Sequence, residues 1–182
     1  MNEKDDIIFI QEFTDNKYIK VEDFFEKDSY IIFHNSDLKI KSSVVAIALN
    51  GTPWEIVKPE DGADLVNKYI EMKLKKELRV IGFHNTDEVI KEMINEHFQK
   101  GDNQVILGDF NDKEWIVSLD SEENKYRDLV TDGMITFKPA QTAIDRIFVK
   151  KGQVDLITFN DVDVIETYAS DHNVLTLLLN KN

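Results

Sequence analysis

The chain has 182 residues, enough for one well-buried core and short for two domains, so we expect a single domain over residues 1–182. Its composition, 42% hydrophobic and 31% charged, is that of a folded soluble protein, and the absence of cysteine excludes disulfides, a thiolate nucleophile and cysteine-based metal sites. A net charge of -13 argues against binding to nucleic acid through a broad cationic surface, but it is compatible with an enzyme that holds a divalent cation on carboxylates.

The N-terminal residues are charged, and the apolar runs of the sequence are short. A secretory signal needs a basic start followed by an apolar segment, and the longest apolar run, residues 44–49, is far too short to span a bilayer. We therefore expect a cytoplasmic protein with no membrane span.

Four short runs in the first third of the chain have the apolar composition of strands. The first run stops at Gln11 and Glu12, so it places polar groups at its C-terminal end. The predicted strands cover residues 7–10, 30–33, 44–49 and 54–57.

Residues 63–78 have apolar side chains at helical spacing and lysines near their C-terminal end, where cations suit the helix dipole, so we predict a helix there. A strand over residues 79–83 follows and ends at His84. A second helix comes next, bounded by a capping residue and a stopping glycine. These boundary residues are Thr86 or Asp87 at its start and Gly101 at its end.

The stretch over residues 105–111, which reads "VILGDFN", begins as a buried strand and ends in polar residues. A strand-ending turn explains this composition, because Gly, Asp and Asn are typical of turns. We favour a second explanation, strand alternation. In that case Phe110 points into the core, and Asp109 and Asn111 share the opposite face.

The region over residues 112–133 is polar and weakly patterned. Strand-like runs follow it, and the sequence "SDH", residues 170–172, precedes the last of them. These runs cover residues 134–138, 144–149, 154–159 and 174–179.

Four of the predicted strands have metal- or proton-handling side chains at one terminus. A packed sandwich of sheets gathers such ends in one cleft, so we expect these side chains to lie together. The residues concerned are Glu12, His84, Asp109, Asn111, Asp171 and His172.

Five motifs run in order along nearly the whole chain: "DIIFIQE" (6–12), "VIGFHN" (80–85), "VILGDFN" (105–111), "AIDRIFV" (143–149) and "SDH" (170–172). In this order they resemble the motifs of the endonuclease/exonuclease/phosphatase superfamily, which has the fold of deoxyribonuclease I. The resemblance implies an α+β fold, a four-layer α/β/β/α sandwich. Only eleven residues precede Glu12. We therefore expect the usual first strand and helix to be lacking, and an edge to be completed in a homodimer or a larger parent assembly.

The resemblance implies a divalent cation, Mg²⁺ or alternatively Mn²⁺. Glu12 matches the family's metal ligand and Asp171 its second carboxylate near the metal. Mg²⁺ suits such a site because it prefers a few carboxylate oxygens and keeps several waters.

The remaining roles implied by the resemblance concern protons and the phosphate. Asp109 orients and deprotonates the attacking water, and the Asn111 amide contacts the phosphate or the developing oxyanion. His172 donates to a non-bridging phosphate oxygen, while Asp145 holds its imidazole in one tautomer and favours the cation. His84 matches the histidine that assists the leaving group in deoxyribonuclease I-like members.

Ordinary structural roles compete with these assignments. Glu12 can be a solvated strand-end carboxylate, and His84 a satisfied structural histidine. Asp145 can pair with Arg146 or cap a turn.

The leading functional hypothesis is a Mg²⁺-dependent phosphodiesterase, a nuclease whose substrate is a nucleic acid or another phosphodiester. The first alternative is a phosphatase of phosphorylated inositols or lipids, because residues 145–147, "DRI", resemble a motif of inositol polyphosphate phosphatases. The second is a degenerate binding or regulatory module that kept the cleft and lost turnover.

Overall fold

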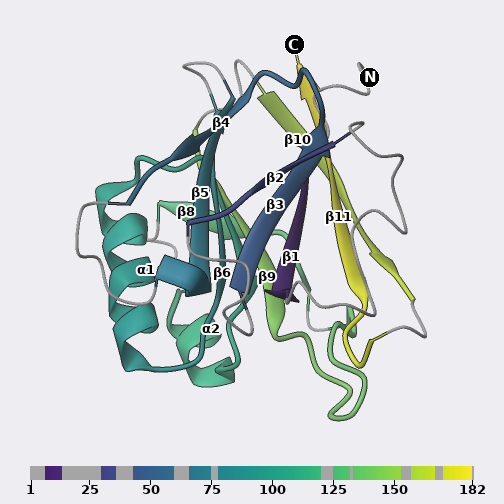
Figure 1. The fold of residues 1–182 in the computed structure, drawn as a ribbon. Helices are drawn as coiled ribbons and strands as arrows, with labels where there is room; N and C mark the ends of the chain where they lie inside the picture. The colour runs from purple at the N-terminus through teal and green to yellow at the C-terminus, as the bar shows by residue number, and fades with distance from the viewer. Residues whose placement is uncertain are drawn as a thin grey trace. The chain divides into compact units, whose positions relative to one another are not determined.

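The computed structural model describes residues 7–13, 30–35, 43–59, 66–74, 78–119, 125–131, 133–152, 157–166 and 170–181 (Figure 1). The chain divides into two compact units, which we call unit 1 (Met1–Lys91) and unit 2 (Glu92–Asn182). Each unit is described by itself, and the single domain expected over residues 1–182 stays a prediction. Within the described residues, no helix is long and apolar enough to cross a membrane.

The first sheet of unit 1 contains β1 (Ile7–Phe13), β2 (Tyr30–Phe33) and β3 (Ser43–Leu49), with β3 in the middle and both pairings antiparallel. These strands confirm three of the predicted runs. Val45 and Ile47 of β3 are buried and form the centre of a hydrophobic cluster. The partly buried residues packed against them are Ile10, Phe13, Tyr30 and Ile32.

The second set of strands in unit 1 runs in the order β4 (Trp54–Val57), β5 (Tyr69–Leu74) and β6 (Leu78–His84), with antiparallel pairing throughout. The strands predicted as 54–57 and 79–83 are therefore confirmed. A single 3₁₀ turn, η3 (Val66–Lys68), precedes β5.

The helix predicted over residues 63–78 is wrong, because its central part is the strand β5. Met72 pairs with Ile56 on one side and with Val80 on the other, so β5 is an inner strand. Such a strand is buried on both faces, and its apolar run has no clear period that separates it from a buried helix. Residues 63–65 and 75–77 of the predicted helix lie outside the described residues.

The helix α1 (Glu88–Lys100) begins in unit 1 and ends in unit 2, with the predicted boundaries. Asp87 Oδ1 accepts the amide hydrogens of Val89 (3.0 Å) and Ile90 (3.2 Å), which makes Asp87 the N-cap. Gly101, at φ 71°, ends the helix, and its amide donates to the carbonyl of His97 at 2.9 Å.

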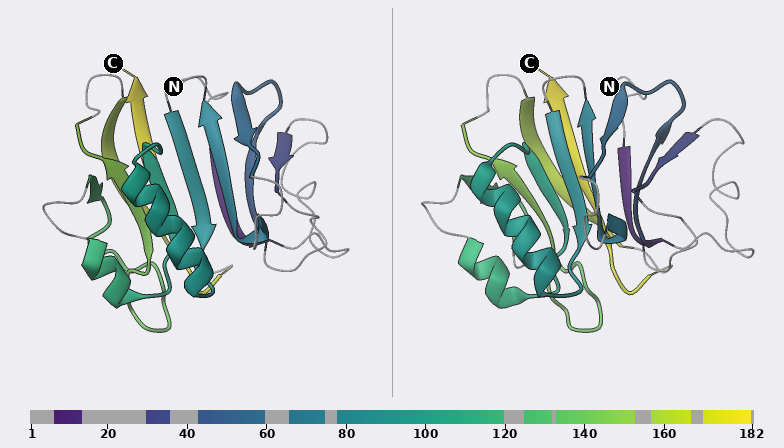
Figure 2. Two further views of the ribbon diagram at one scale, coloured as in Figure 1. Left: turned by 90° about the vertical axis from the view of Figure 1, so that its left-hand side faces the viewer. Right: turned by 60° about the vertical axis from the view of Figure 1, so that its left-hand side comes forward.

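Unit 2 contains β7 (Val105–Asp109), β9 (Asp145–Lys150) and β8 (Tyr126–Asp128), antiparallel in that order. The helix α2 (Lys113–Leu119) follows β7 directly. Both α2 and β8 lie in the region that the sequence left without a clear pattern. The α2 helix and the part of α1 that belongs to unit 2 lie on the same side of these strands (Figure 2).

Aromatic side chains hold the helices of unit 2 to its sheet. The Phe98 ring of α1 lies 5.2 Å from Phe148 of β9 and 5.0 Å from Tyr126 of β8. Trp115 of α2 lies 4.7 Å from Phe110, which in turn lies 5.3 Å from Phe148. These centroid distances are typical of favourable aromatic pairs, so the rings anchor the end of β7 in the core.

The last two strands, β10 (Ile157–Ile165) and β11 (Val174–Lys181), form an antiparallel pair with a bulge between Phe159 and Val162. They confirm the runs predicted around 154–159 and 174–179, although residues 154–156 lie outside the described residues. The strand predicted over 134–138 is wrong. Phe137 makes only isolated bridges, to Thr142 and to His172, because the chain turns at Lys138–Gln141.

Candidate active site

The sequence "VILGDFN" forms a strand end followed by a turn. The strand β7 ends at Asp109, and Asp109 Oδ1 accepts the amide hydrogen of Asn111 at 2.9 Å. Phe110 is fully buried, as strand alternation predicts, and its amide donates to the carbonyl of Ile144 at 3.0 Å. Asn111 is exposed at φ 53°, in the left-handed region. The turn, and not continued strand alternation, therefore sets the direction of Asn111.

Asp145 opens β9 directly opposite Asp109 in the antiparallel register. Both carboxylates are buried, with side-chain exposures of 5% for Asp109 and 12% for Asp145. Buried carboxylates need hydrogen-bond or charge partners, and the partner of Asp145 is His172.

His172 lies between the two carboxylates. Its Nδ1 is 2.8 Å from Asp145 Oδ2, a hydrogen-bond distance, and its Nε2 is 4.0 Å from Asp109 Oδ2. The hydrogen bond to Asp145 raises the pKa of His172; partial burial opposes this shift, and the negative charges of Asp145, Asp109 and Asp171 support it. The hydrogen bond therefore fixes the ring with Nδ1 toward Asp145 and Nε2 on the side of Asp109.

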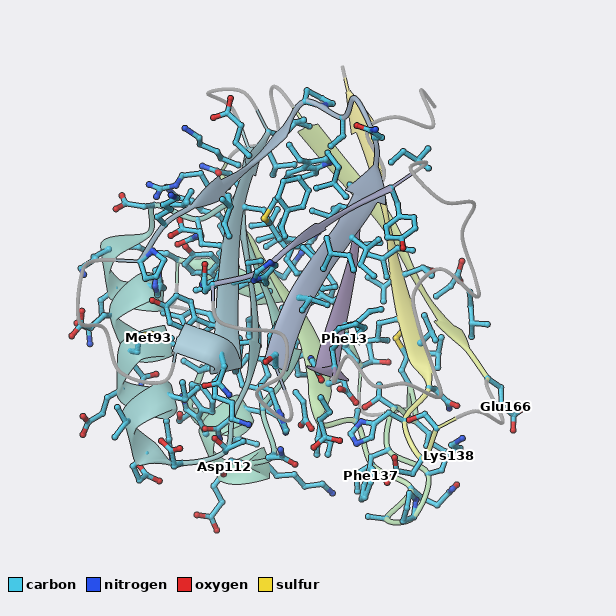
Figure 3. All side chains as sticks on the ribbon, in the orientation of Figure 1. Phe13, Met93, Asp112, Phe137, Lys138 and Glu166 are labelled. Carbon is cyan, nitrogen blue, oxygen red and sulfur yellow. The ribbon has the colours of Figure 1, made fainter. Side chains whose placement is uncertain are left out.

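The loop that carries His172 is fixed by hydrogen bonds to the segment before β9. Lys138 donates its amide hydrogen to the carbonyl of Asp171 at 2.9 Å, and its Nζ donates to the carbonyl of Ser170. Ser170 Oγ accepts the amide hydrogen of His172 at 3.1 Å. The Phe137 ring lies 4.9 Å from the imidazole of His172, and Phe137 and Lys138 lie together beside this loop (Figure 3). The Asp171 side chain itself is exposed.

In unit 1 the structure brings Glu12 and His84 together. Glu12 lies in a β-bulge of β1 at φ 54°, so the predicted stop of the strand at Gln11 is a bulge, and the strand continues to Phe13. Glu12 Oε1 is 3.9 Å from His84 Nε2; the Glu12 side chain is 68% exposed and that of His84 is 7% exposed. The bulge thus leaves a carboxylate in water beside a buried imidazole.

Two contacts hold β1 against β6. Gln11 Nε2 donates to the carbonyl of Phe83 at 3.2 Å. The Phe9 ring lies so close over Gly82 that a Cβ at position 82 would overlap it. A glycine at this position therefore permits the close approach that places Glu12 beside His84.

Asp109, Asp145 and His172 offer ligand atoms within 4.8 Å of one another, the one group of this kind found among the described residues. These side chains could hold a metal ion, but Asp145 Oδ2 and His172 Nδ1 already share a hydrogen bond. Mg²⁺ takes oxygen ligands and keeps several waters, so exposed carboxylates such as Glu12 and Asp171 fit its chemistry better than this buried group. Glu12 belongs to unit 1, and its role as a metal ligand stays a prediction.

Two further residues lie beside the cluster and are not among the predicted site residues, Thr136 and Asn173. Thr136 is fully buried, and it contacts the main chain at both Asp145 and Asn173. The sequence predicts a strand over residues 134–138, and a threonine in such a run gives no signal of its own.

No protein-family model and no curated protein sequence matches this chain. Solved structures do match it. D. rerio TDP2 complexed with a single-stranded DNA product is similar at 15% identity and a TM-score of 0.65, over 97% of this chain and 86% of that chain. An endonuclease/exonuclease/phosphatase from Bacteroides vulgatus matches at 16% identity and a TM-score of 0.63, over 97% and 85% of the two chains.

The endonuclease domain of TRAS1, a telomere-specific non-LTR retrotransposon, is also similar, at 18% identity and a TM-score of 0.61, over 84% of this chain and 80% of that chain. At these identities the likeness concerns the fold. The resemblance stated from the motifs is confirmed at that level, because the chain has the α+β, deoxyribonuclease I-like fold of the endonuclease/exonuclease/phosphatase structures.

Proposed function

We propose that the protein is a Mg²⁺-dependent phosphodiesterase, and specifically a nuclease. The observation that carries the proposal is the buried cluster in unit 2, in which a histidine is bonded to one aspartate and faces a second across 4.0 Å. This gap is too long for a direct hydrogen bond, but the oxygen of a water molecule placed between the two groups would lie about 2.8 Å from each.

In the proposed reaction, Asp109 accepts a proton from the attacking water. Its carboxylate is oriented by the amide hydrogen of Asn111, which leaves Oδ2 on the side of His172. The exposed Asn111 amide contacts the phosphate or the charge that develops on it.

His172 donates a hydrogen bond from Nε2 to a non-bridging phosphate oxygen. Asp145 supports this role because its hydrogen bond to Nδ1 fixes the ring and raises the pKa of the imidazole, which favours the cation. In unit 1, His84, which lies beside Glu12, is assigned the role of assisting the leaving group.

We assign Glu12 and Asp171 the role of metal ligands, because they are the exposed carboxylates that the motifs indicate. A bound Mg²⁺ would neutralise phosphate charge and polarise the ester. The choice of nucleic acid as the substrate is supported by the DNA product in the TDP2 complex and by the endonuclease domain of TRAS1, which share the fold. The cytoplasmic location expected from the sequence stays a prediction, as does completion of the fold in a homodimer or larger assembly.

The inositol or lipid phosphatase hypothesis rested on the sequence "DRI", and the structure gives Arg146 another role. Its side chain is 6% exposed, and Nη1 lies 3.1 Å from Asp128 Oδ2. Its Nε donates to the carbonyl of Ala143 at 3.0 Å. Because the Arg146 side chain is bonded to Asp128 and to the main chain at Ala143, the "DRI" motif does not support binding of an inositol phosphate.

A substrate panel tests the proposal: plasmid, single-stranded DNA, RNA, bis-p-nitrophenyl phosphate and an inositol polyphosphate, each with Mg²⁺ and with EDTA. We expect Mg²⁺-dependent cleavage of a nucleic acid and its loss in Asp109→Asn and His172→Asn. Asp163→Asn and His34→Asn, at exposed positions, are the matched controls. Phosphate release from inositol phosphates alone would favour the first alternative, and binding without turnover of any ester would favour the degenerate module.

A further inference from the structure

Thr136 lies where two segments of the candidate site meet. It is fully buried, and its Oγ1 accepts the amide hydrogens of Ile144 at 3.1 Å and of Asp145 at 3.0 Å. Its main-chain carbonyl accepts the amide hydrogen of Asn173 at 2.7 Å. One residue therefore bonds to the backbone of Asp145 and to the backbone of the residue after His172.

Asp145 and His172 are 27 positions apart in the sequence, and their side chains meet at 2.8 Å. Such a distance depends on how the start of β9 and the loop over residues 170–173 are placed relative to each other. Thr136 contacts both segments. A second tie runs beside it, since Asn173 Nδ2 donates to the carbonyl of Ile135 at 2.9 Å.

We propose that Thr136 is a positioning residue, which holds Asp145 and His172 at hydrogen-bonding distance for the reaction. This inference rests on the proposed function for its catalytic consequence, although the geometry it concerns exists without a substrate. Displacement of a catalytic group by about 1 Å can lower a rate by about 100-fold, so the residue that fixes this pair has a large influence without touching the ester.

The hydroxyl oxygen is the part of Thr136 that matters. A valine has a similar shape but no acceptor, so it would leave the buried amide hydrogens of Ile144 and Asp145 without this partner. A serine retains the oxygen. The pair Thr136→Val and Thr136→Ser therefore separates the hydrogen bonds from the packing of the side chain.

The experiment compares these two variants with Thr176→Val, a matched change in β11, where the hydroxyl lies 3.5 Å from the carbonyl of Asp163. Two quantities are measured: kcat and KM with Mg²⁺ on the best substrate of the panel, and the downfield proton NMR signal of His172 Nδ1–H at one fixed pH. His172→Asn assigns that signal.

For Thr136→Val we expect kcat to fall about 10- to 100-fold with KM within about 3-fold, and the Nδ1–H signal to broaden or disappear. Thr136→Ser and Thr176→Val should keep kcat within about 3-fold of that of the original protein and should keep the Nδ1–H signal. An unchanged signal and an unchanged kcat in Thr136→Val would overturn the proposal. If the original protein cleaves no ester, the proposed function fails, and the NMR signal still decides the positioning role.

Thr136→Ala decides the question if Thr136→Val does not fold, because alanine also lacks the oxygen that accepts the amide hydrogens of Ile144 and Asp145 and puts no methyl group in the place of the hydroxyl. We expect a weaker Nδ1–H signal and a fall in kcat of about 3- to 10-fold, in line with the loss of hydrogen bonds. No change in either quantity would overturn the proposal.

Discussion

The two units present a carboxylate and a histidine in opposite ways. In unit 1, Glu12 is 68% exposed and stands 3.9 Å from a buried His84. In unit 2, Asp145 is 12% exposed and is joined at 2.8 Å to His172, whose own side chain is 29% exposed. One pair has its carboxylate in water, and the other has its carboxylate in the protein interior.

This difference separates two kinds of chemistry. A solvated carboxylate can exchange its waters for a cation without breaking protein hydrogen bonds, which suits an ion site. A buried carboxylate bonded to an imidazole instead fixes a ring and holds a proton, because leaving either group unpaired costs free energy. The proposed roles follow this difference: the exposed carboxylate of Glu12 is proposed as an ion ligand, and the bonded pair of Asp145 and His172 as the group that holds a proton.

Substitution of the imidazole in unit 2 should have the largest effect. His172→Asn removes the proposed donor to the phosphate and the partner of Asp145. We expect kcat to fall about 10³-fold, within the range for the loss of a donor to developing charge, while the fold is retained because the His172 side chain is 29% exposed and asparagine keeps a hydrogen-bond donor. Steady-state kinetics with Mg²⁺ and circular dichroism check this. A loss below about 10-fold would remove the basis for treating the cluster as catalytic.

Substitution of the exposed carboxylate in unit 1 should have a different signature. Glu12→Gln keeps the size of the side chain and removes its charge, so the Mg²⁺ concentration needed for half-maximal rate should rise about 10- to 100-fold. Stability should change by no more than about 0.5 kcal/mol, since Glu12 is exposed. Mg²⁺ titrations of the rate measure the effect. If Glu12→Gln lowers the rate equally at all Mg²⁺ concentrations, the assignment of Glu12 to the ion is wrong.

The close approach of β1 and β6 offers a structural test within unit 1. Gly82→Ala places a methyl group against the Phe9 ring and should lower the free energy of unfolding by about 1–3 kcal/mol. The matched control is Gly133→Ala, where a Cβ meets nothing within 4 Å. Denaturant unfolding compares the two. Equal stability of both variants would contradict the contact between Phe9 and Gly82.

The smallest predicted effect is on the pH dependence. The pKa of His172 lies above its ordinary value of about 6.5, so its contribution to stability is complete below that pH and is lost as the pH rises through the higher folded-state pKa. Asp145→Asn removes the main cause and should lower the pKa of His172. NMR titration of the ring protons in EDTA measures this. A pKa in Asp145→Asn equal to that of the original protein would contradict the stated cause.

The sequence predicted the strands that carry the site better than it predicted their surroundings. The β-branched run before Asp109 and the capping Asp87 have local causes, so the elements β7 and α1 were found with nearly correct bounds. The inner strand β5 was mistaken for a helix because burial on both faces depends on its partners β4 and β6, which no local pattern reveals. Pairing with these strands, and not local propensity, determines the secondary structure of β5.

The same limit applies to the candidate site. The motifs identified the candidate side chains but not their directions. The direction of Asn111 depends on its left-handed backbone, and the position of Glu12 depends on a bulge in the pairing of β1 with β3. The hydrogen bonds of Thr136 join three separate stretches of chain. None of these features leaves a periodic signal in one sequence.

The most direct test of the account is a double-mutant cycle on the bonded pair of unit 2. Asp145→Asn, His172→Asn and the combined variant are compared by kcat with saturating Mg²⁺. If the two residues act as one unit, the combined variant should be within about 3-fold of His172→Asn alone, because the role of Asp145 is exercised through the imidazole. A combined loss equal to the product of the two single losses would contradict the account, since the residues would then act independently.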